Sequence, residues 1–262
     1  MALILRSHAP RQARLHRDQI RERLAGTINR WLISTLGIRL TSVRATGVDE
    51  AWFDRLLYLN RVLALVEGIP GDIVECGVSH GRSLAMIAAL LRSNRQKRCI
   101  WGFDCWAGLP PPASEDLDRG QGIARPGVFS GASIASVMTT LRWFGFTDDE
   151  IRRTIVLRQG LFRDTLPQFP DRPIALLHID VDLYQSYKEC LAHLWDHVAD
   201  GGVVALDEYH DYEDWPGAKK AVDEFLATLP PGAASLQEDR PYGRYFITKK
   251  SASLPSVPVM TS

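Results

Sequence analysis

The sequence predicts an α/β fold with a doubly wound, mostly parallel sheet. From Asp72 onward, short apolar runs alternate with segments of helical periodicity, and the runs are apolar throughout instead of alternating with polar residues. Strands with this pattern are buried on both faces, as in parallel sheets that helices cover above and below. We therefore expect one α/β domain from residue 46 to residue 250.

Length and charge agree with one large domain and short flanking segments. The chain has 262 residues, with 31 Lys plus Arg against 31 Asp plus Glu, so its formal net charge is zero. A chain of this length can bury a substantial core. Because the charge is balanced, nothing global predicts nucleic acid as a partner, and partners have to be inferred from individual sites.

Cysteine usage and apolar runs predict a cytoplasmic protein. The four cysteines form no C-x-x-C pair and match no zinc spacing, so we expect free thiols in a reducing compartment. The longest apolar runs are strand-length, well short of the roughly 20 residues of a membrane helix, so no stable membrane insertion is expected. The basic N-terminus lacks the pattern of a secretion signal.

Residues 1–45 are expected to form a helical extension of the domain. The Arg-rich stretch from Arg11 to Leu40 spaces its apolar residues at roughly helical intervals, which predicts an amphipathic helix. Its basic face could contact an anionic membrane or an acidic polymer. Docking of the apolar stripe on the domain or on a second subunit, with the basic face solvated, is favoured. For this reason we expect a homo-oligomer, a dimer or a tetramer.

The elements of the domain follow in order along the chain. A helix is expected over "DEAWFDRLLYLNRVLALVEGI", because its start is acidic and it closes at Gly68 and Pro70. The expected strands are "DIVECG" from Asp72, "RCIWGFD" from Arg98, "TIVLRQG" from Thr154, "PIALLHID" from Pro173 and "GGVVALDE" from Gly201. The helices between and after them are expected near residues 83–92, 133–144, 184–198 and 216–229.

Three further segments complete the organisation. Two last strands, around "AASLQE" and "YGRYFITKK", are separated only by a turn at "DRPYG", which favours an antiparallel edge pair. The irregular stretch from Trp106 to Gly131 is rich in Pro, Gly and Asp, which is typical of a lid, a binding loop or a disordered loop. Residues 251–262 are polar and interrupted by Pro, so we expect a disordered tail.

A glycine-containing turn follows the first predicted strand. In "ECGVSHGRS", Glu75, Gly77, Gly81 and Ser83 lie between the strand and the next helix. Glycines there let a ligand approach the backbone, and the helix start offers N–H donors. The turn is looser than the dinucleotide fingerprint and lacks the P-loop Lys, so a tight turn without a ligand is the alternative.

Asp104, after the second strand, suits a hydrogen bond to both ribose hydroxyls, and the two features together indicate a nucleoside cofactor.

Four acidic residues follow two strands that should be neighbours. In "LLHIDVDLYQSY", Asp180 and Asp182 lie two residues apart at the end of a strand and should point the same way, and Asp207 and Glu208 end the next strand. Four carboxylates there repel one another unless a cation neutralises them or some are protonated, and Mg²⁺ answers this most directly. The alternative is that Asp182 caps the following helix and Glu208 is solvated, which explains one acid better than three.

With "DIVECGVSHGRS", "FDCWAGLP", "LRQGLFRDTLP", "IDVDLYQS" and "GGVVALDEY" in this order, the chain resembles the macrocin O-methyltransferase family. These are S-adenosylmethionine-dependent enzymes, several of which methylate sugar hydroxyls of antibiotics. The resemblance runs from about Ala51 to about Leu229. It implies a class I methyltransferase (Rossmann-like) fold, with a seven-stranded sheet whose last strand is antiparallel. It also implies bound S-adenosylmethionine, bound Mg²⁺ and a catalytic Asp.

The resemblance also implies roles for single residues. Asp180, Asp207 and Glu208 correspond to the metal ligands, and Asp182 corresponds to the general base. The cofactor motifs correspond to Glu75, Gly77, Ser83, Asp104, Ser133, Gln159 and Gly160. The chain departs from the family in two places. Glu208 stands where the family usually has a second Asp, and Ser79 and His80 stand where it often has an aromatic residue followed by Arg or Lys.

These observations predict a Mg²⁺-dependent enzyme that methylates a hydroxyl of a sugar in a glycoside, oligosaccharide or polysaccharide. Asp182 would accept the hydroxyl proton, and His210 is the second candidate base, ahead of His178 and His80. Trp106 and Phe129 of the irregular stretch could stack on a sugar ring. A catechol-type small-molecule O-methyltransferase is an alternative, because vicinal oxygens of a catechol satisfy Mg²⁺ equally well. The sequence is also compatible with a non-methyltransferase nucleotide-binding protein and with a catalytically inactive scaffold.

Overall fold

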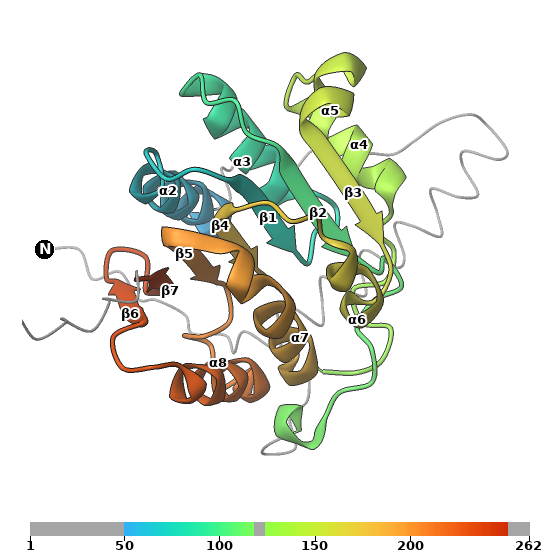
Figure 1. Cartoon of the computed structure of the whole chain (residues 1–262). Helices are drawn as coiled ribbons and strands as arrows, with labels where there is room; N and C mark the ends of the chain where they lie inside the picture. Colours follow the sequence, from blue (N-terminus) through green and yellow to red (C-terminus); the bar gives the residue numbers. More distant parts are fainter. Residues whose placement is uncertain (1–49, 118–123, 251–262) are drawn as a thin grey trace, which may run out of the picture. The chain divides into compact units, whose positions relative to one another are not determined.

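The computed structural model describes residues 50–117 and 124–250 of the chain. The described part consists of one sheet with helices on both faces (Figure 1). The predicted N-terminal helix and C-terminal tail lie outside the described residues.

The sheet has seven strands in the order β3-β2-β1-β4-β5-β7-β6. Five are parallel to one another, and β7 pairs antiparallel with both β5 and β6. The strands are β1 (Asp72–Cys76), β2 (Ile100–Asp104), β3 (Ile155–Gln159), β4 (Ile174–Ile179), β5 (Val198–Leu206), β6 (Ala234–Asp239) and β7 (Arg244–Lys249). The predicted doubly wound sheet and its final antiparallel pair are confirmed.

The helices cover both faces of this sheet. The bounds of the α-helices are α2 (Glu50–Leu65), α3 (Arg82–Ser93), α4 (Ile134–Trp143), α5 (Asp148–Thr154), α6 (Phe162–Thr165), α7 (Tyr184–Leu194) and α8 (Pro216–Thr228). Short 3-10 helices are η1 (Ser114–Asp116), η2 (Leu166–Gln168) and η3 (Trp195–His197). Helix α5 was not predicted, although Thr147 and Glu150 form a capping box at its start.

Two hydrophobic cores lie on opposite faces of the sheet. Successive strand residues face opposite ways, so Ile73 enters one core and Val74 the other. The first core packs against α2, α3 and α4, and the second packs against α7 and α8. Strands β1, β2 and β4 are buried along almost their whole length, which explains their uniformly apolar sequences.

The predicted irregular loop is anchored where the structure describes it. Leu109 and Val128 pair through the backbone near its two ends, with Leu109 N–H donating to the Val128 carbonyl at 2.8 Å. The carboxylate of Asp116 accepts hydrogen bonds from Ala113 N–H at 2.8 Å and from Tyr184 N–H, in the first turn of α7, at 2.7 Å. The loop is therefore tied to the helix that follows β4.

The cysteines and the apolar helices of the described residues bear on two predictions, that of free thiols and that of no membrane insertion. All four cysteines are free, with Cys76 and Cys190 buried. Among the described residues, no helix combines the length and the apolar character that crossing a bilayer requires.

Candidate active site

The four acidic residues lie beside one another at the carboxyl end of the sheet. Strand β4 ends at Ile179 and β5 ends at Leu206, and these two residues are register partners in adjacent parallel strands. Asp180 follows the first strand, and Asp207 follows the second. A carboxylate oxygen of each, together with a ring nitrogen of His178, lies within 4.8 Å of the others.

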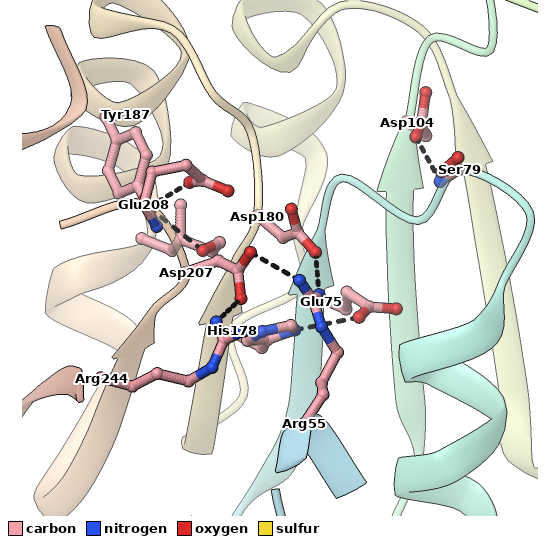
Figure 2. A network of polar contacts seen from close by, with 11 residues as sticks. Arg55, Glu75, Ser79, Asp104, His178, Asp180, Tyr187, Asp207, Glu208 and Arg244 are labelled. Carbon is pink, nitrogen blue, oxygen red and sulfur yellow. Dashed lines mark hydrogen bonds and ion pairs between the residues drawn. The ribbon is translucent and has the colours of Figure 1, made fainter. Parts of the chain in front are cut away.

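Two arginines that the sequence patterns did not identify bind these carboxylates (Figure 2). Arg55 of α2 donates from Nη1 to Asp180 Oδ2 at 2.5 Å and from Nη2 to Asp207 Oδ2 at 2.7 Å. Arg244 of β7 donates to the other oxygen of Asp207. Burial acts to raise the pKa of Asp207, but the charges of Arg55 and Arg244 outweigh it and lower that pKa below its ordinary value.

Arg55 could have been recognised from its place in the helix. It lies four residues before Leu59 and seven before Val62, both fully buried, so it shares the apolar face of α2. A charged residue on such a face needs a partner. The carboxylates supply one, and they raise the pKa of Arg55 although burial opposes this.

His178 and Glu75 form a buried polar pair between β4 and β1. The two residues are register partners, and His178 Nδ1 lies 2.9 Å from Glu75 Oε1. Their side chains are 1% and 0% exposed. Burial raises the pKa of Glu75, and the hydrogen bond to His178 opposes that shift. Glu75, predicted to contact the cofactor, is placed inside the domain with His178 as its partner, and its contact with a cofactor stays a prediction.

Asp182 lies near the other acids, but not for the predicted reason. The expectation that strand pleating aligns Asp180 with Asp182 is wrong, because β4 ends before both. Asp182 instead has a left-handed backbone with φ 61°, uncommon outside glycine. Burial raises its pKa, the charges of Asp180 and Asp207 raise it further, and the charge of Arg55 opposes them.

The alternative role of Asp182 as a helix cap is contradicted. The cap residue of α7 is Leu183, which offers no side-chain hydrogen bond. The first N–H of the helix, that of Tyr184, is bound by Asp116 from the irregular loop. Asp182 is therefore not needed to satisfy the start of α7.

Glu208 turns toward Tyr187 of α7, whose hydroxyl donates to Glu208 Oε2 at 2.6 Å. It is buried, and burial raises its pKa, as do the charges of Asp180 and Asp207. Of the three predicted ligands, Asp180 and Asp207 lie together, and His178 completes the group that could hold a metal among the described residues. Ligation by Glu208 stays a prediction.

His210 follows the buried residues Glu208 and Tyr209, and its own side chain is partly exposed. Desolvation and the charge of Arg244 lower its pKa, while the charge of Asp207 acts in the opposite direction. A lowered pKa keeps the imidazole neutral near pH 7, which is the form that can accept a proton. His210 thus lies near Asp207, and its role as a base stays a prediction.

The predicted cofactor residues gather at the ends of β1, β2 and β3. Asp104 accepts hydrogen bonds from Ser79 N–H and from Trp106 N–H, each at 2.7 Å, and so joins the turns after β1 and β2 (Figure 2 shows the Ser79 bond). Gly160 N–H donates to the Asp104 carbonyl at 3.0 Å, and Gln159 lies at the end of β3. All of these groups lie at the sheet edge that carries the acids.

Two further predicted residues have local roles in helices. Ser83 is buried in the first turn of α3. Ser133 is exposed and is the cap residue of α4, where its hydroxyl accepts a hydrogen bond from Ser136 N–H. Cofactor contacts by either residue stay predictions.

The glycine turn touches the acid cluster through the backbone. Gly77 has φ 87°, and a Cβ placed on it would lie 1.7 Å from the carbonyl oxygen of Asp180. Only glycine satisfies both conditions. The glycine turn and the first acid are therefore in direct main-chain contact.

We expect Gly77→Ala to lower the free energy of unfolding by at least about 2 kcal/mol, because alanine is strained at this φ and collides with the Asp180 carbonyl. Urea unfolding followed by circular dichroism measures this loss. Gly68→Ala is the matched control, since no atom lies within 4 Å of a Cβ at that position. Equal stability of the two variants would contradict the close approach.

Comparisons with known proteins identify the family of this chain. A family model described as macrocin O-methyltransferase (TylF) matches residues 50–229. A 4'-O-methyltransferase of Streptomyces olivaceus that acts on 8-demethyl-8-(2,3-dimethoxy-alpha-L-rhamnosyl)-tetracenomycin C is 30% identical over 205 residues. Those residues cover 74% of this chain and 77% of the relative.

A solved protein, CalS11, has the same fold in two structures. The structure described as calicheamicin methyltransferase has a TM-score of 0.65 and 26% identity, and it covers 95% of this chain and 97% of its own. The apo structure, described as a TDP-rhamnose 3'-O-methyltransferase of calicheamicin biosynthesis, has a TM-score of 0.54 and 26% identity, with coverage of 83% and 85%. The family match spans most of the described domain, and the resemblance expected from the motifs is confirmed. The chain belongs to the macrocin O-methyltransferase family and is an S-adenosylmethionine-dependent O-methyltransferase.

Proposed function

We propose that this enzyme methylates a hydroxyl of a sugar, carried by a glycoside, an oligosaccharide or a polysaccharide, with Mg²⁺ bound at Asp180 and Asp207. The observation that carries the proposal is the contact between Gly77 and the Asp180 carbonyl. Because of this contact, a methyl donor held at the glycine turn would lie beside the acids. Sugar as the acceptor is supported by two relatives whose names specify rhamnose, the enzyme of Streptomyces olivaceus and CalS11.

The residues present fit a divalent cation. Two carboxylates and a ring nitrogen converge within 4.8 Å, and the guanidinium of Arg55 lies between the carboxylates as a positively charged stand-in. Asp180, Asp207 and the predicted ligand Glu208 would hold the ion through oxygen atoms, which Mg²⁺ prefers. When bound, Mg²⁺ supplies an electrophile that orients the acceptor hydroxyl and lowers its pKa.

The side chains around the cluster then have separate tasks. Asp182 accepts the proton of the attacking hydroxyl. It lies close enough to Asp180, Asp207 and Asp104 for their charges to raise its pKa, and Asp104 is on the cofactor side. Asp104 binds the ribose of the donor and holds the two turns together through Ser79 and Trp106. Holding donor and acceptor at near-attack distance supplies much of the rate.

The irregular loop and the segment after β5 would form the acceptor side. The ring of Phe129, half exposed, lies 6.4 Å from the ring of Trp215, just before α8. Exposed aromatic rings stack on the apolar faces of sugars.

A catechol would fit the same acids, so the acceptor has to be identified by experiment. The homo-oligomer, its location in the cytoplasm and the absence of a nucleic-acid partner remain part of the proposal.

Methyl transfer to a panel of glycosides, oligosaccharides and catechols tests the proposal. We expect turnover of sugar-bearing acceptors with Mg²⁺ present, loss of at least about a hundredfold after EDTA treatment because an electrophile is removed from the acceptor, and recovery when Mg²⁺ is returned. Labelled methyl incorporation measures the rate.

Two controls accompany this panel. Binding of S-adenosylhomocysteine without binding of NAD separates the methyltransferase from another nucleotide-binding protein. Turnover of catechols alone would contradict the sugar acceptor, and full activity in EDTA would contradict the metal.

A further inference from the structure

Three of the four oxygens of Asp180 and Asp207 are bound by guanidinium groups in this structure. Arg55 takes Oδ2 of each residue, and Arg244 takes Oδ1 of Asp207. Figure 2 shows the guanidinium of Arg55 placed between the two carboxylates, where it bridges them. A divalent ion shared by the same two carboxylates needs that space and those lone pairs.

We propose that Arg55 is an internal competitor of the metal. It and the divalent cation are alternative occupants of the Asp180–Asp207 pair, and metal binding requires Arg55 to withdraw. This inference rests on the proposed metal dependence of the enzyme. Retaining both would place a guanidinium against a divalent cation, and the repulsion between like charges opposes that arrangement.

His178 gives an independent indication that this group of side chains binds a cation. It is 1% exposed, and among the described residues its Nε2 has no hydrogen-bond partner. If Nδ1–H donates to Glu75, then Nε2 carries the free lone pair. A carboxylate that orients a histidine in this way is the usual support for a metal-binding imidazole. With Arg55 in place, the same nitrogen is unsatisfied.

Arg55, and not Arg244, is the residue that can leave. Arg55 lies near the beginning of α2, which starts at Glu50. Arg244 begins strand β7, which is paired with β5 on one side and β6 on the other, and its guanidinium stacks over the ring of Tyr58. Withdrawal of Arg55 from the carboxylates requires only the movement of a side chain or of the helix end. Withdrawal of Arg244 would disturb the pairing of strand β7 in the sheet.

Trp52 would report the withdrawal and connect it to the cofactor turn. Its ring lies 5.2 Å from the guanidinium carbon of Arg55 and 4.9 Å from that of Arg82. Arg82 is the first residue of α3, directly after the glycine turn. When Arg55 leaves the acids, one of the two cations against this indole moves, so the emission of Trp52 changes.

The test compares metal binding by the full-length wild type and by Arg55→Gln, which has no charge to place between the acids. Mn²⁺ binding is measured from the electron paramagnetic resonance signal of the free ion, and Mg²⁺ binding by calorimetry. We expect Arg55→Gln to bind both ions at least about tenfold more tightly, because a competing charge-assisted pair is gone. Arg142→Gln, which removes an exposed pair with Asp148, is the control and should match the wild type.

Two additional measurements make the result independent of one variant. Arg55→Lys keeps the charge but cannot bridge two carboxylates through a planar fork, so its affinity should lie between those of Gln and the wild type. Addition of Mg²⁺ should change the tryptophan emission of the wild type but not that of Trp52→Phe. Equal or weaker metal binding by Arg55→Gln, or an unchanged wild-type emission at saturating Mg²⁺, would overturn the proposal.

The outcomes separate this inference from the proposed function. If wild type and Arg55→Gln bind both ions equally, the competition is wrong and the metal-dependent reaction stands. If neither protein binds Mn²⁺ or Mg²⁺ while S-adenosylhomocysteine still binds, then the metal site and the competition both fail.

Discussion

Asp182→Asn is expected to lower kcat for methyl transfer about a thousandfold, within the range for loss of a general base, while S-adenosylhomocysteine affinity stays within about twofold. Asparagine keeps the size of the side chain but cannot accept the hydroxyl proton. It also tolerates the left-handed backbone at φ 61°, so the local structure should persist. Steady-state methyl transfer and calorimetric titration of the cofactor product measure the two quantities.

The controls for this variant distinguish chemistry from folding. Asp171→Asn changes an exposed residue before β4, at the opposite end of the strand, and should retain full activity. The melting temperature of Asp182→Asn should be unchanged or raised, because one of several adjacent negative charges is removed. Turnover at the wild-type rate would remove Asp182 from the base role and leave His210 as the candidate to substitute next.

His178→Ala is expected to lower the free energy of unfolding by about 3–5 kcal/mol. The substitution removes the hydrogen bond between His178 and Glu75, which is 0% exposed and keeps Ser83 as a second partner, and it opens a cavity between β1 and β4. For a domain of this size, the loss corresponds to a fall in melting temperature of about 10 °C. Scanning calorimetry and urea unfolding measure it.

A set of matched variants tests the cause of that loss. Glu75→Gln preserves an acceptor at the same position and should lose less than half as much stability. Replacing Glu75 and His178 together by leucine should recover a large part of the loss, because no buried polar group is then left unpaired. Loss of less than about 1 kcal/mol in His178→Ala would show that Glu75 finds another partner.

The parallel arrangement of the sheet and the place of the acids could be predicted from the sequence, because both depend on local pattern. Uniformly apolar strands predict a parallel sheet, and the residues directly after β4 and β5 must then meet at one edge. Asp180 and Asp207 are brought together for this reason. Asp104 and Gly77 could be placed at the same end of the sheet, because each lies at the end of its strand or directly after it.

The contacts across the site could not be predicted in this way. Arg55 reaches Asp207 from 152 residues away in the chain, and local periodicity shows only that it is a charged residue on an apolar face. The start of α7 is bound by Asp116, 68 residues before Tyr184, and not by its neighbour Asp182. The expected alignment of Asp180 and Asp182 failed because strand β4 ends earlier than its sequence pattern suggests.

The main-chain contact between Gly77 and Asp180 affects how members of the family can come to accept different acceptor molecules. The glycine turn and the first acid are held in register by backbone atoms, so no side-chain rotamer separates them. The segments that would face the acceptor, the irregular loop and the chain between β5 and α8, lie outside this contact. If the proposed function holds, their residues can be exchanged to suit new acceptors while the glycine turn and the first acid keep their alignment.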